Sequence, residues 1–240
     1  LAGHLKLKNL IMLFDNNSIS IDGPTSLAVS DNFKKRFESY NWNYLEINGH
    51  NEKEIFKALK KVQNAKKPTV ISCKTIIGYG SPNKSGKASS HGSPLGIEEI
   101  ELARKKLGWN YKPFEIPKNI LRIWRDIGEK GEKVENKWNK IYRKKKSKIK
   151  KFFKNDFLKS AVNEKKIALK EEKSLASRKS SESIINSLVK NNNTLIGGSA
   201  DLAGSNNTKT IYHKIISPGN FRGNYIPVSY THLRAHETAV

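Results

Sequence analysis

The chain has 240 residues, and its 45 Lys and Arg outnumber its 22 Asp and Glu, which gives a formal net charge of +23. Hydrophobic residues make up 36% and aromatic residues 9%, which excludes wholesale disorder and predicts a packed core. The single cysteine, Cys73, excludes an intrachain disulfide framework and a zinc site built from cysteines. Without a secretory signal or a long apolar run, the sequence favours a soluble cytoplasmic protein that has no membrane partner.

The positive charge is concentrated in residues 137–159, which read KWNKIYRKKKSKIKKFFKNDFLK. A basic segment of this kind raises nucleic acid as a partner. Lys dominates over Arg there, and Asn and Ile are abundant throughout, a bias typical of coding DNA rich in A and T. We therefore favour compositional drift and expect no nucleic-acid partner. A basic nucleic-acid-binding protein remains an alternative, which a salt-dependent gel shift with unrelated DNA would test.

Residues 1–110 alternate between strand-like and helix-like periodicity. Three apolar runs predict strands, and they span residues 9–14, 43–49 and 69–75. Two amphipathic segments between them predict helices at residues 31–40 and 51–67, and Pro68 ends the second. This alternation predicts an α/β fold with a parallel sheet and crossover helices. The first strand is expected to be fully buried, and Cys73 in the third strand to be a core residue.

Each helix of this region is expected to bury one face. The first helix has Asp31 as its N-cap, and its inward side chains are Phe33, Phe37 and Tyr40. The inward side chains of the second are Ile55, Phe56, Leu59 and Val62. A further amphipathic helix, in GIEEIELARKKLGW, has a core stripe of Ile97, Ile100 and Leu107.

Two loops follow strands of the predicted sheet, at the edge where such folds bind ligands. The first lies in FDNNSISIDG, residues 14–23, where Asp15, Asn16 and Asn17 interrupt an apolar run as a polar turn. The second, residues 76–96, is too long and too rich in Gly and Ser for a plain connector. Its backbone amides are suited to cradle an anion, although a Gly-rich loop is weak support for that by itself.

The first loop offers hard oxygen donors. The side-chain carbonyl of Asn17 and the backbone carbonyl of Ile19 are spaced to fill adjacent positions around Mg²⁺ or Ca²⁺, at about 2.0 to 2.6 Å. The alternative is an Asx-turn, in which Asn17 only accepts a hydrogen bond from its own backbone. Spacing alone favours the turn, since two neutral ligands need a carboxylate from elsewhere to hold a divalent ion.

Three further residues have side chains suited to chemistry. His91 is flanked by small residues in SSHGSPLG. The spacing favours neither of two roles: a core residue, or a residue in a cleft where the imidazole pKa would suit proton transfer. Arg178 lies at a predicted helix start, a position suited to a phosphate, although an exposed surface arginine is the commoner reason for this pattern. Asp201, in GGSADLAGS, is open to being a plain turn acid.

The pattern changes after residue 117. Residues 118–174 are rich in lysine, with apolar residues at helical spacing, and predict a helical linker whose helices lie over a surface. Residues 175–227 predict the start of a second α/β domain, with a capped helix from Ser177 and a short strand opening into a Gly/Ser loop. The inward residues of that helix are expected to be Ile184, Ile185 and Leu188.

Five strings in this chain resemble one family, the transketolases. They are LAGHLKLKNLIMLFDNNSISIDG, CKTIIGYGSPNKSGKASSHGSPLG, LGWNYKPFEIP, ASRKSS and GGSADLAGSN, in this order and spacing, and the resemblance covers residues 1–226. It implies a cytoplasmic homodimeric enzyme that uses thiamine diphosphate with Mg²⁺, or else Ca²⁺ or Mn²⁺. It also implies reversible transfer of a two-carbon ketol group from a ketose phosphate to an aldose phosphate in the pentose phosphate pathway.

The resemblance also implies roles for residues of the first loop. Asn17 and the backbone carbonyl of Ile19 would coordinate the metal, which in turn binds the diphosphate of the cofactor. Ile21 lies in the same motif and is expected to be a packing residue. Asn16 departs from the family pattern, in which many relatives carry a second acid, but it is not the assigned ligand.

Four more residues receive roles from the resemblance. His91 would be the catalytic residue that contacts both the diphosphate and the reacting substrate. Arg178 and Ser205 would hold the sugar phosphate, and Asp201 would lie near the cofactor and the hydroxyls of the donor. Gly204 stands where Pro is usual in the family, which is expected to loosen the turn before Ser205.

We expect the chain to be an internal fragment of such an enzyme. Residues 1–117 would be the C-terminal part of the diphosphate-binding domain, residues 118–174 the linker, and residues 175–227 the beginning of the pyrimidine-binding domain. A further metal-ligating Asp would precede Leu1, and the Glu that activates the aminopyrimidine would follow residue 226. The fragment alone is therefore expected to be inactive and to bind magnesium weakly or not at all.

The last residues do not follow the family pattern. VSYTHLRAHET, residues 228–238, resembles a translated sequencing adapter, so residues 228–240 are expected to be an artefact. His232 and His236 lie at helical i, i+4 spacing, but for this reason we do not assign them to a metal site. A second alternative for the whole chain is a related thiamine enzyme such as dihydroxyacetone synthase, which shares these motifs and differs in its acceptor.

Overall fold

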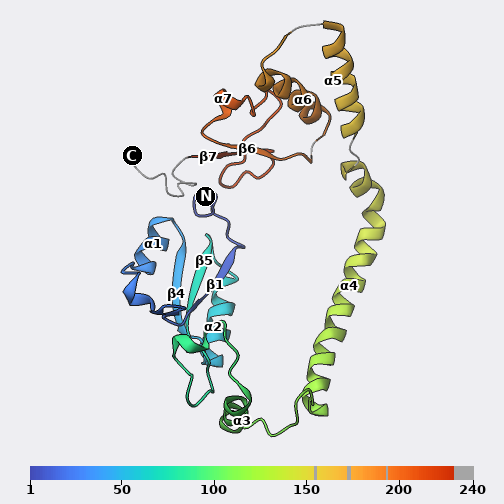
Figure 1. Ribbon diagram of the computed structural model, residues 1–240. Helices are drawn as coiled ribbons and strands as arrows, with labels where there is room; N and C mark the ends of the chain where they lie inside the picture. The colour runs from blue at the N-terminus through green and yellow to red at the C-terminus, as the bar shows by residue number, and fades with distance from the viewer. Residues whose placement is uncertain (154–155, 172–173, 193, 230–240) are drawn as a thin grey trace. The chain divides into compact units, whose positions relative to one another are not determined.

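The computed structural model describes residues 1–153, 156–171, 174–192 and 194–229 of the chain (Figure 1). The chain divides into two compact units. One comprises Ala2–Trp124, and the other comprises Leu1 with Arg125–Val240. We call them the first and the second unit.

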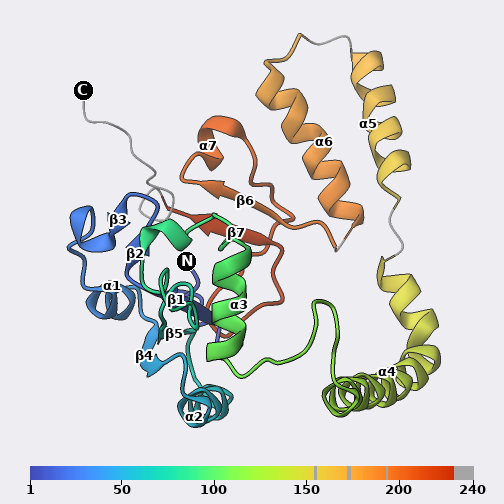
Figure 2. The same cartoon turned by 60° about the horizontal axis from the view of Figure 1, so that its bottom comes forward.

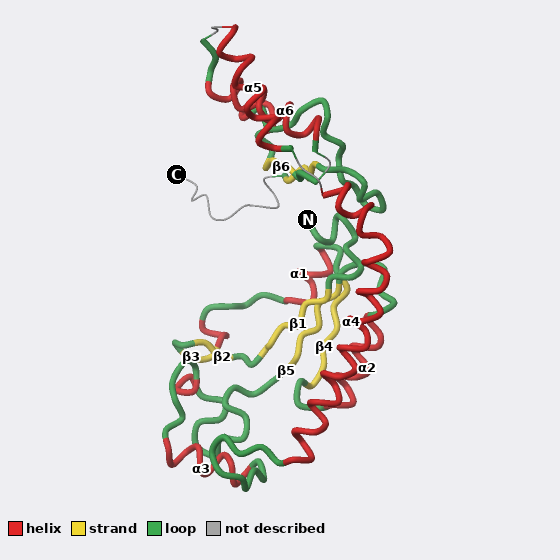
Figure 3. The backbone as a smooth tube through the Cα atoms, turned by 90° about the vertical axis from the view of Figure 1, so that its right-hand side faces the viewer, coloured by secondary structure: helices red, strands yellow, loops and turns green. Residues whose placement is uncertain are grey.

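The first unit is built on a three-stranded parallel sheet with the strand order β1-β5-β4. Its strands are β1 (Ile11–Asn16), β4 (Asn43–Asn48) and β5 (Thr69–Lys74), and they run side by side in Figure 3. Two helices connect them along the chain, α1 (Phe33–Ser39) after β1 and α2 (Glu52–Val62) between β4 and β5. The predicted α/β fold with a parallel sheet and connecting helices is therefore confirmed.

Smaller elements complete the first unit. Strands β2 (Ile19–Ser20) and β3 (Gly23–Pro24) form an antiparallel hairpin, followed by the short 3-10 helix η1 (Thr25–Leu27). The long loop after β5 contains a second 3-10 helix, η2 (Ala88–Ser90), and leads into α3 (Ile97–Lys106).

The core of the first unit lies between β5 and α2. Val70 and Ile71 of β5 are 0% exposed, and Ile71 packs against Ala58 and Val62 of α2. The partly buried residues packed against this cluster are Ile11, Leu45, Ile47 and Cys73. The prediction that Cys73 is a packing residue is confirmed, and burial, together with the nearby Asp15 carboxylate, raises the pKa of its thiol.

Strand β1 differs from the predicted strand in extent and in burial. It continues through Asp15 and Asn16, which pair with Cys73 and Lys74 of β5, so these two residues do not form the predicted turn. It is also not fully buried, since Leu13 is 61% exposed. The reason is that β1, unlike the central strand β5, pairs with only one strand within the described residues.

The N-cap of α1 is Asn32, so the prediction of Asp31 is wrong. The helix begins at Phe33, and Asn32 Oδ1 accepts a hydrogen bond from the backbone N–H of Lys35 at 2.9 Å. Asp31 instead forms an ion pair with Arg36. Either side chain is chemically able to cap a helix, and the start of the helix decides between them.

The buried faces of α2 and α3 also differ from the predicted ones. In α2 the fully buried residues are Ala58 and Val62, whereas Phe56 is 67% exposed and Leu59 is also exposed. The face that contacts the sheet is therefore narrower than the apolar pattern suggests.

In α3 the fully buried residues are Glu99 and Ala103. The predicted core stripe is wrong, because its members Ile97, Ile100 and Leu107 are all exposed. The face of α3 that carries Glu99 is turned toward the preceding loop, which supplies hydrogen-bond donors to the Glu99 carboxylate.

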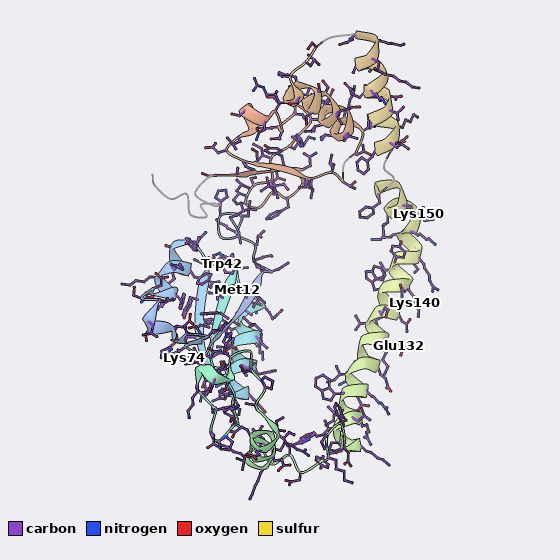
Figure 4. The ribbon with its side chains drawn as sticks, in the orientation of Figure 1. Met12, Trp42, Lys74, Glu132, Lys140 and Lys150 are labelled. Atoms are coloured by element: carbon purple, nitrogen blue, oxygen red, sulfur yellow. The ribbon has the colours of Figure 1, made fainter. Side chains whose placement is uncertain are left out.

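Two helices occupy the segment that was predicted to be a helical linker. Helix α4 spans Lys118–Phe153 and α5 spans Phe157–Glu171, so the predicted helical character is confirmed for the described residues. Lys140 and Lys150 project from α4 in Figure 4. The rings of Trp138 and Tyr142 stack on each other along this helix, with centroids 5.1 Å apart.

The second unit also contains α6 (Ser177–Asn191), the parallel pair β6 (Gly197–Ala200) and β7 (Tyr225–Val228), and the short helix α7 (Ala203–Asn206). Helices α5 and α6 lie side by side (Figure 2), and Ser187 Oγ of α6 donates to the backbone oxygen of Ser160 in α5 at 3.3 Å. Among the described residues of this unit, the buried apolar ones are Tyr225 and Val189.

Helix α6 starts at Ser177 as predicted, but it has no side-chain cap. Its N-cap position is occupied by Ala176, which has no oxygen in its side chain, so the predicted cap is wrong. The expected inward residues Ile184, Ile185 and Leu188 are half-buried, and Val189 is the one that is fully buried.

Two predictions concern membranes and the last residues. Within the described residues, no helix is both long enough and apolar enough to cross a bilayer. Val228 is the last residue of β7. His232, His236 and the rest of the predicted artefact from residue 230 onward lie outside the described residues.

Candidate functional site

The loop after β1 forms a tight turn around Asn17. Asn17 Oδ1 accepts a hydrogen bond from the backbone N–H of Ile19 at 3.0 Å, and Ser18 between them has a φ of 60°. A positive φ is uncommon for a residue with a side chain and is often found at functional turns. The Asx-turn that spacing alone favours is therefore present.

The backbone carbonyl of Ile19 faces the same side as the Asn17 side chain. In the β2–β3 hairpin the N–H of Thr25 donates to Ser18 O at 2.9 Å, so the next pair, Ile19 and Pro24, lies at a non-hydrogen-bonded position. In an extended residue the N–H and the C=O point toward the same side of the strand. The N–H of Ile19 points to Asn17 Oδ1, so the Ile19 carbonyl also points toward the side of Asn17. Pro24 has no N–H that it could donate to the Ile19 oxygen.

The Asx-turn and metal ligation are compatible, because a side-chain amide oxygen has two lone pairs and the turn uses one. The turn also fixes the orientation of Asn17 Oδ1, and both Asn17 and Ile19 are half-buried. The Asp15 carboxylate nearby accepts a hydrogen bond from the Thr75 hydroxyl. In the part of the chain that the structure describes, no three His, Cys, Asp or Glu gather as a metal site. Both oxygens are of the donor type that Mg²⁺ accepts, and a complete ligand set would need further groups.

The second loop begins against His50, which follows β4. The N–H of Ile76 donates to His50 Nε2 at 2.9 Å, and the ring of Tyr79 stacks on the imidazole with centroids 4.0 Å apart. A Cβ atom at Gly49 would lie 2.5 Å from Thr75 Cγ2, so only glycine fits at this turn. A cleft of about 670 Å³ at the carboxyl ends of β4 and β5 is lined in part by His50, Thr75, Ile76 and Tyr79. The sequence pattern does not single out His50, although a Gly-His pair directly after a strand is a signal that could have done so.

Glu99 of α3 holds the middle of the second loop. It is 7% exposed, and its carboxylate accepts hydrogen bonds from the Ser81 hydroxyl, from the Asn83 N–H at 2.8 Å and from Asn83 Nδ2 at 2.9 Å. These donors, the Ser81 hydroxyl first, lower the pKa of Glu99 to about 2. Sequence reasoning missed Glu99, because an acidic residue in an amphipathic helix is normally expected on the exposed side.

His91 follows the short helix η2 and is exposed. Its backbone N–H donates to Ala88 O at 2.8 Å, and Gly92 after it has a φ of 70°. Exposure excludes the core-filling alternative for this histidine within the chain and leaves the imidazole open to a ligand.

Ile21, between β2 and β3, was expected to be a packing residue. It is 72% exposed, so this expectation is not met within the chain. Its side chain stands at the tip of the two-residue turn that joins the hairpin strands.

Arg178, Asp201 and Ser205 belong to the second unit, whereas Asn17, Ile19 and His91 belong to the first. Arg178 is exposed in the first turn of α6, at the position the sequence predicts. Asp201 directly follows β6 with a φ of 62°, and Ser205 lies in α7. Both are exposed. The structure thus brings Asn17 and Ile19 together in one turn, and Asp201 and Ser205 together in one strand-to-helix connection.

The sequence matches the family model described as transketolase, thiamine diphosphate binding domain, over residues 1–166. A transketolase of Buchnera aphidicola (subsp. Acyrthosiphon pisum) is 43% identical over 239 residues, covering 94% of this chain and 36% of the relative. Transketolase 2 of Escherichia coli is 42% identical over 221 residues, covering 87% of this chain and 33% of the relative. The chain thus spans about a third of the length of these curated relatives.

Solved structures give the same result. A crystal structure of transketolase from Campylobacter jejuni matches with a TM-score of 0.81 and 35% identity, over 94% of this chain and 35% of that one. Transketolase from Pichia stipitis in complex with sedoheptulose-7-phosphate matches with a TM-score of 0.81 and 29% identity, over 94% of this chain and 36% of that one.

Proposed function

This chain belongs to the transketolase family, and we propose that it supplies part of the active site of an enzyme that transfers a two-carbon ketol group from a ketose phosphate to an aldose phosphate. The observation that carries the proposal is the turn after β1, in which Asn17 Oδ1 and the Ile19 carbonyl face the same side. The match of residues 1–166 to a thiamine diphosphate binding domain supports it.

The turn is proposed to hold a divalent cation. Mg²⁺, Ca²⁺ and Mn²⁺ all accept side-chain and backbone carbonyl oxygens as ligands, and Asn17 and Ile19 would each supply one. The remaining positions would be filled by diphosphate oxygens and by groups outside this turn. Thiamine diphosphate, when bound, supplies the carbon nucleophile and the electron sink.

His91 is proposed as the catalytic residue of the first unit. Its exposed imidazole is suited to donate a hydrogen bond to a phosphate oxygen and to move a proton at an oxygen of the substrate. The loop on either side of it is held by internal hydrogen bonds, which would limit the number of positions that the imidazole samples.

The second unit is proposed to bind the sugar phosphate. Arg178 combines a guanidinium group with the first turn of a 15-residue helix, and both attract a phosphate. Ser205 would add a hydroxyl to the phosphate, and Asp201 would accept hydrogen bonds from hydroxyls of the donor. The Pichia stipitis relatives in complex with sedoheptulose-7-phosphate and fructose-6-phosphate support this class of substrate.

We assign the chain regions on the same basis. Residues 1–117 would belong to the diphosphate-binding domain, residues 118–174 to a helical linker, and residues 175–227 to the beginning of the pyrimidine-binding domain. The intact enzyme would be a cytoplasmic homodimer that acts in the pentose phosphate pathway.

A titration of the 240-residue chain with thiamine diphosphate, followed by ¹H–¹⁵N spectra, tests the proposal. Because this chain alone is expected to bind Mg²⁺ weakly, the titration uses Mg²⁺ in large excess. We then expect small shifts at residues 15–20 that EDTA abolishes. Asn17→Ala should weaken the binding about tenfold or more, because it removes a ligand to a charged group. Asn16→Ala is the matched control, since the Asn16 amide donates to Ser72 Oγ instead. Equal affinity with EDTA, or in Asn17→Ala, would contradict the proposed metal site.

A further inference from the structure

Lys84 contacts the second loop on both sides of His91. Its ammonium Nζ donates to the backbone oxygen of Leu95 at 2.8 Å and is 3.4 Å from that of Pro94. Its own backbone oxygen accepts a hydrogen bond from the Ser90 hydroxyl. One residue therefore joins the position directly before His91 to the positions shortly after it.

We propose that Lys84 is a positioning residue that closes residues 84–95 into a ring and so fixes His91. The inference rests on the proposed function in one respect, the role of His91. A lysine suits this task because its ammonium has three donors and no acceptor, so it can bond two carbonyl oxygens at once. Its half-buried stem follows the loop while the charged end reaches the carbonyls.

Lys84 is itself held to a helix. Its backbone N–H donates to Ser81 Oγ at 3.1 Å, and the buried Ser81 hydroxyl donates to the Glu99 carboxylate of α3. The chain of hydrogen bonds thus runs from α3 through Ser81 to Lys84. The ring is therefore attached to a regular element rather than to another loop.

Ser90 is seated by a glycine as well as by Lys84. A Cβ atom at Gly78 would lie 2.8 Å from Ser90 Oγ, so the absence of a side chain at Gly78 makes room for the Ser90 hydroxyl. The backbone N–H of Ser90 donates to Lys87 O at 3.0 Å, and that of His91 donates to Ala88 O at 2.8 Å. These two amides lie inside the ring, so their exchange should respond if the ring opens.

Hydrogen exchange of the full chain tests the ring without any cofactor. In Lys84→Met the stem is kept and the donors are lost, so the amides of Ser90 and His91 should exchange about tenfold faster or more. Lys87→Met is the matched control from the same loop, because the Lys87 side chain is exposed, and its exchange should stay within about twofold of the wild type. Lys84→Arg, which keeps donors at this position, should restore at least part of the protection.

The exchange of β5 distinguishes positioning from general stability. If Lys84→Met accelerates the Ile71 amide as much as the His91 amide, the residue only stabilises the unit and the proposal is overturned. It is also overturned if His91 is equally protected in Lys84→Met and in the wild type.

The thiamine diphosphate titration adds a readout at the site. In Lys84→Met the shift induced at His91 should decrease, while the Mg²⁺-dependent shift at Asn17 persists. Unchanged shifts at both positions would contradict a positioning role. A wild-type chain that shows no shift with thiamine diphosphate would overturn cofactor binding by this chain on its own. The exchange result would still decide whether Lys84 closes the ring.

Discussion

The two units of the chain bury their apolar residues to different extents. In the first unit, β5 is flanked by two strands and covered by α2, so Val70 and Ile71 are fully buried. Among the described residues of the second unit, the buried apolar ones are Tyr225 and Val189, while several apolar residues of α4, such as Trp138 and Ile141, are exposed. The first unit therefore has a core that is formed by its own residues. Helix α4, in contrast, has an apolar stripe that no other part of the described chain covers.

The largest expected effect comes from the core of the first unit. Ile71→Ala should destabilise this unit by about 2–5 kcal/mol, because it leaves a cavity beside α2. Ile141→Ala, on the exposed side of α4, should change the stability by less than about 0.5 kcal/mol. Urea denaturation followed by circular dichroism and by exchange of the β5 amides measures both. Equal effects of the two substitutions would remove the contrast between the units.

The second unit contains a buried polar contact at the end of α6. Asn192 is buried, its Oδ1 accepts from the Asp156 N–H at 3.2 Å, and its Nδ2 donates to Leu188 O at 2.7 Å. Asn192→Ala should cost about 1–3 kcal/mol, because it leaves these groups without their partner. Exchange of the α5 and α6 amides measures this loss, and Asn191→Ala, on an exposed neighbour, should cost less. A smaller loss in Asn192→Ala than in Asn191→Ala would contradict the contact.

The start of α1 provides a smaller test within the first unit. Asn32→Ala should cost about 1 kcal/mol, because it removes the hydrogen bond to the Lys35 N–H. Asp31→Ala should cost less, since the Asp31–Arg36 ion pair is solvent-exposed. Thermal unfolding of the two variants under the same buffer conditions ranks them. The reverse ranking would restore Asp31 as the functional cap.

A last test, made at acid pH, concerns the titration of Glu99. Its pKa is lowered from the ordinary 4.5 to about 2 by the Ser81 and Asn83 donors. A lowered pKa in the folded state means that the stabilisation is complete above pH 4.5 and is lost as the pH falls toward 2. Glu99→Gln should flatten this part of the pH dependence, which exchange of the Asn83 and Lys84 amides would follow. An unchanged acid profile in the variant would show that other carboxyl groups cause the loss.

The presence of strands and helices in the first unit follows from local periodicity. The faces that the helices bury do not, since predicted inward residues such as Tyr40, Phe56 and Ile97 are exposed. The exceptions depend on contacts between distant residues. The sequence of α3 predicts that its apolar stripe is buried and that Glu99 is exposed. Glu99 is instead buried, because the loop around Ser81 supplies three hydrogen-bond donors to its carboxylate.

Spacing alone also did not decide the role of Asn17. It favours an Asx-turn, which the structure contains, while the role in metal binding came from the resemblance to transketolases. Both are possible because one oxygen has two lone pairs, a fact that a sequence pattern does not express. His50 was missed because its hydrogen-bond partner Ile76 is distant in the sequence, after α2 and β5.

Paramagnetic broadening by Mn²⁺ tests the central claim, the metal-binding turn, most directly, because it detects weak binding residue by residue. In the presence of thiamine diphosphate, Mn²⁺ should broaden the amides of Asn17, Ser18 and Ile19 before the rest of the first unit, and Asn17→Ala should abolish this selectivity. Broadening that is centred on exposed carboxylates such as Asp22, with the turn unaffected, would contradict the account.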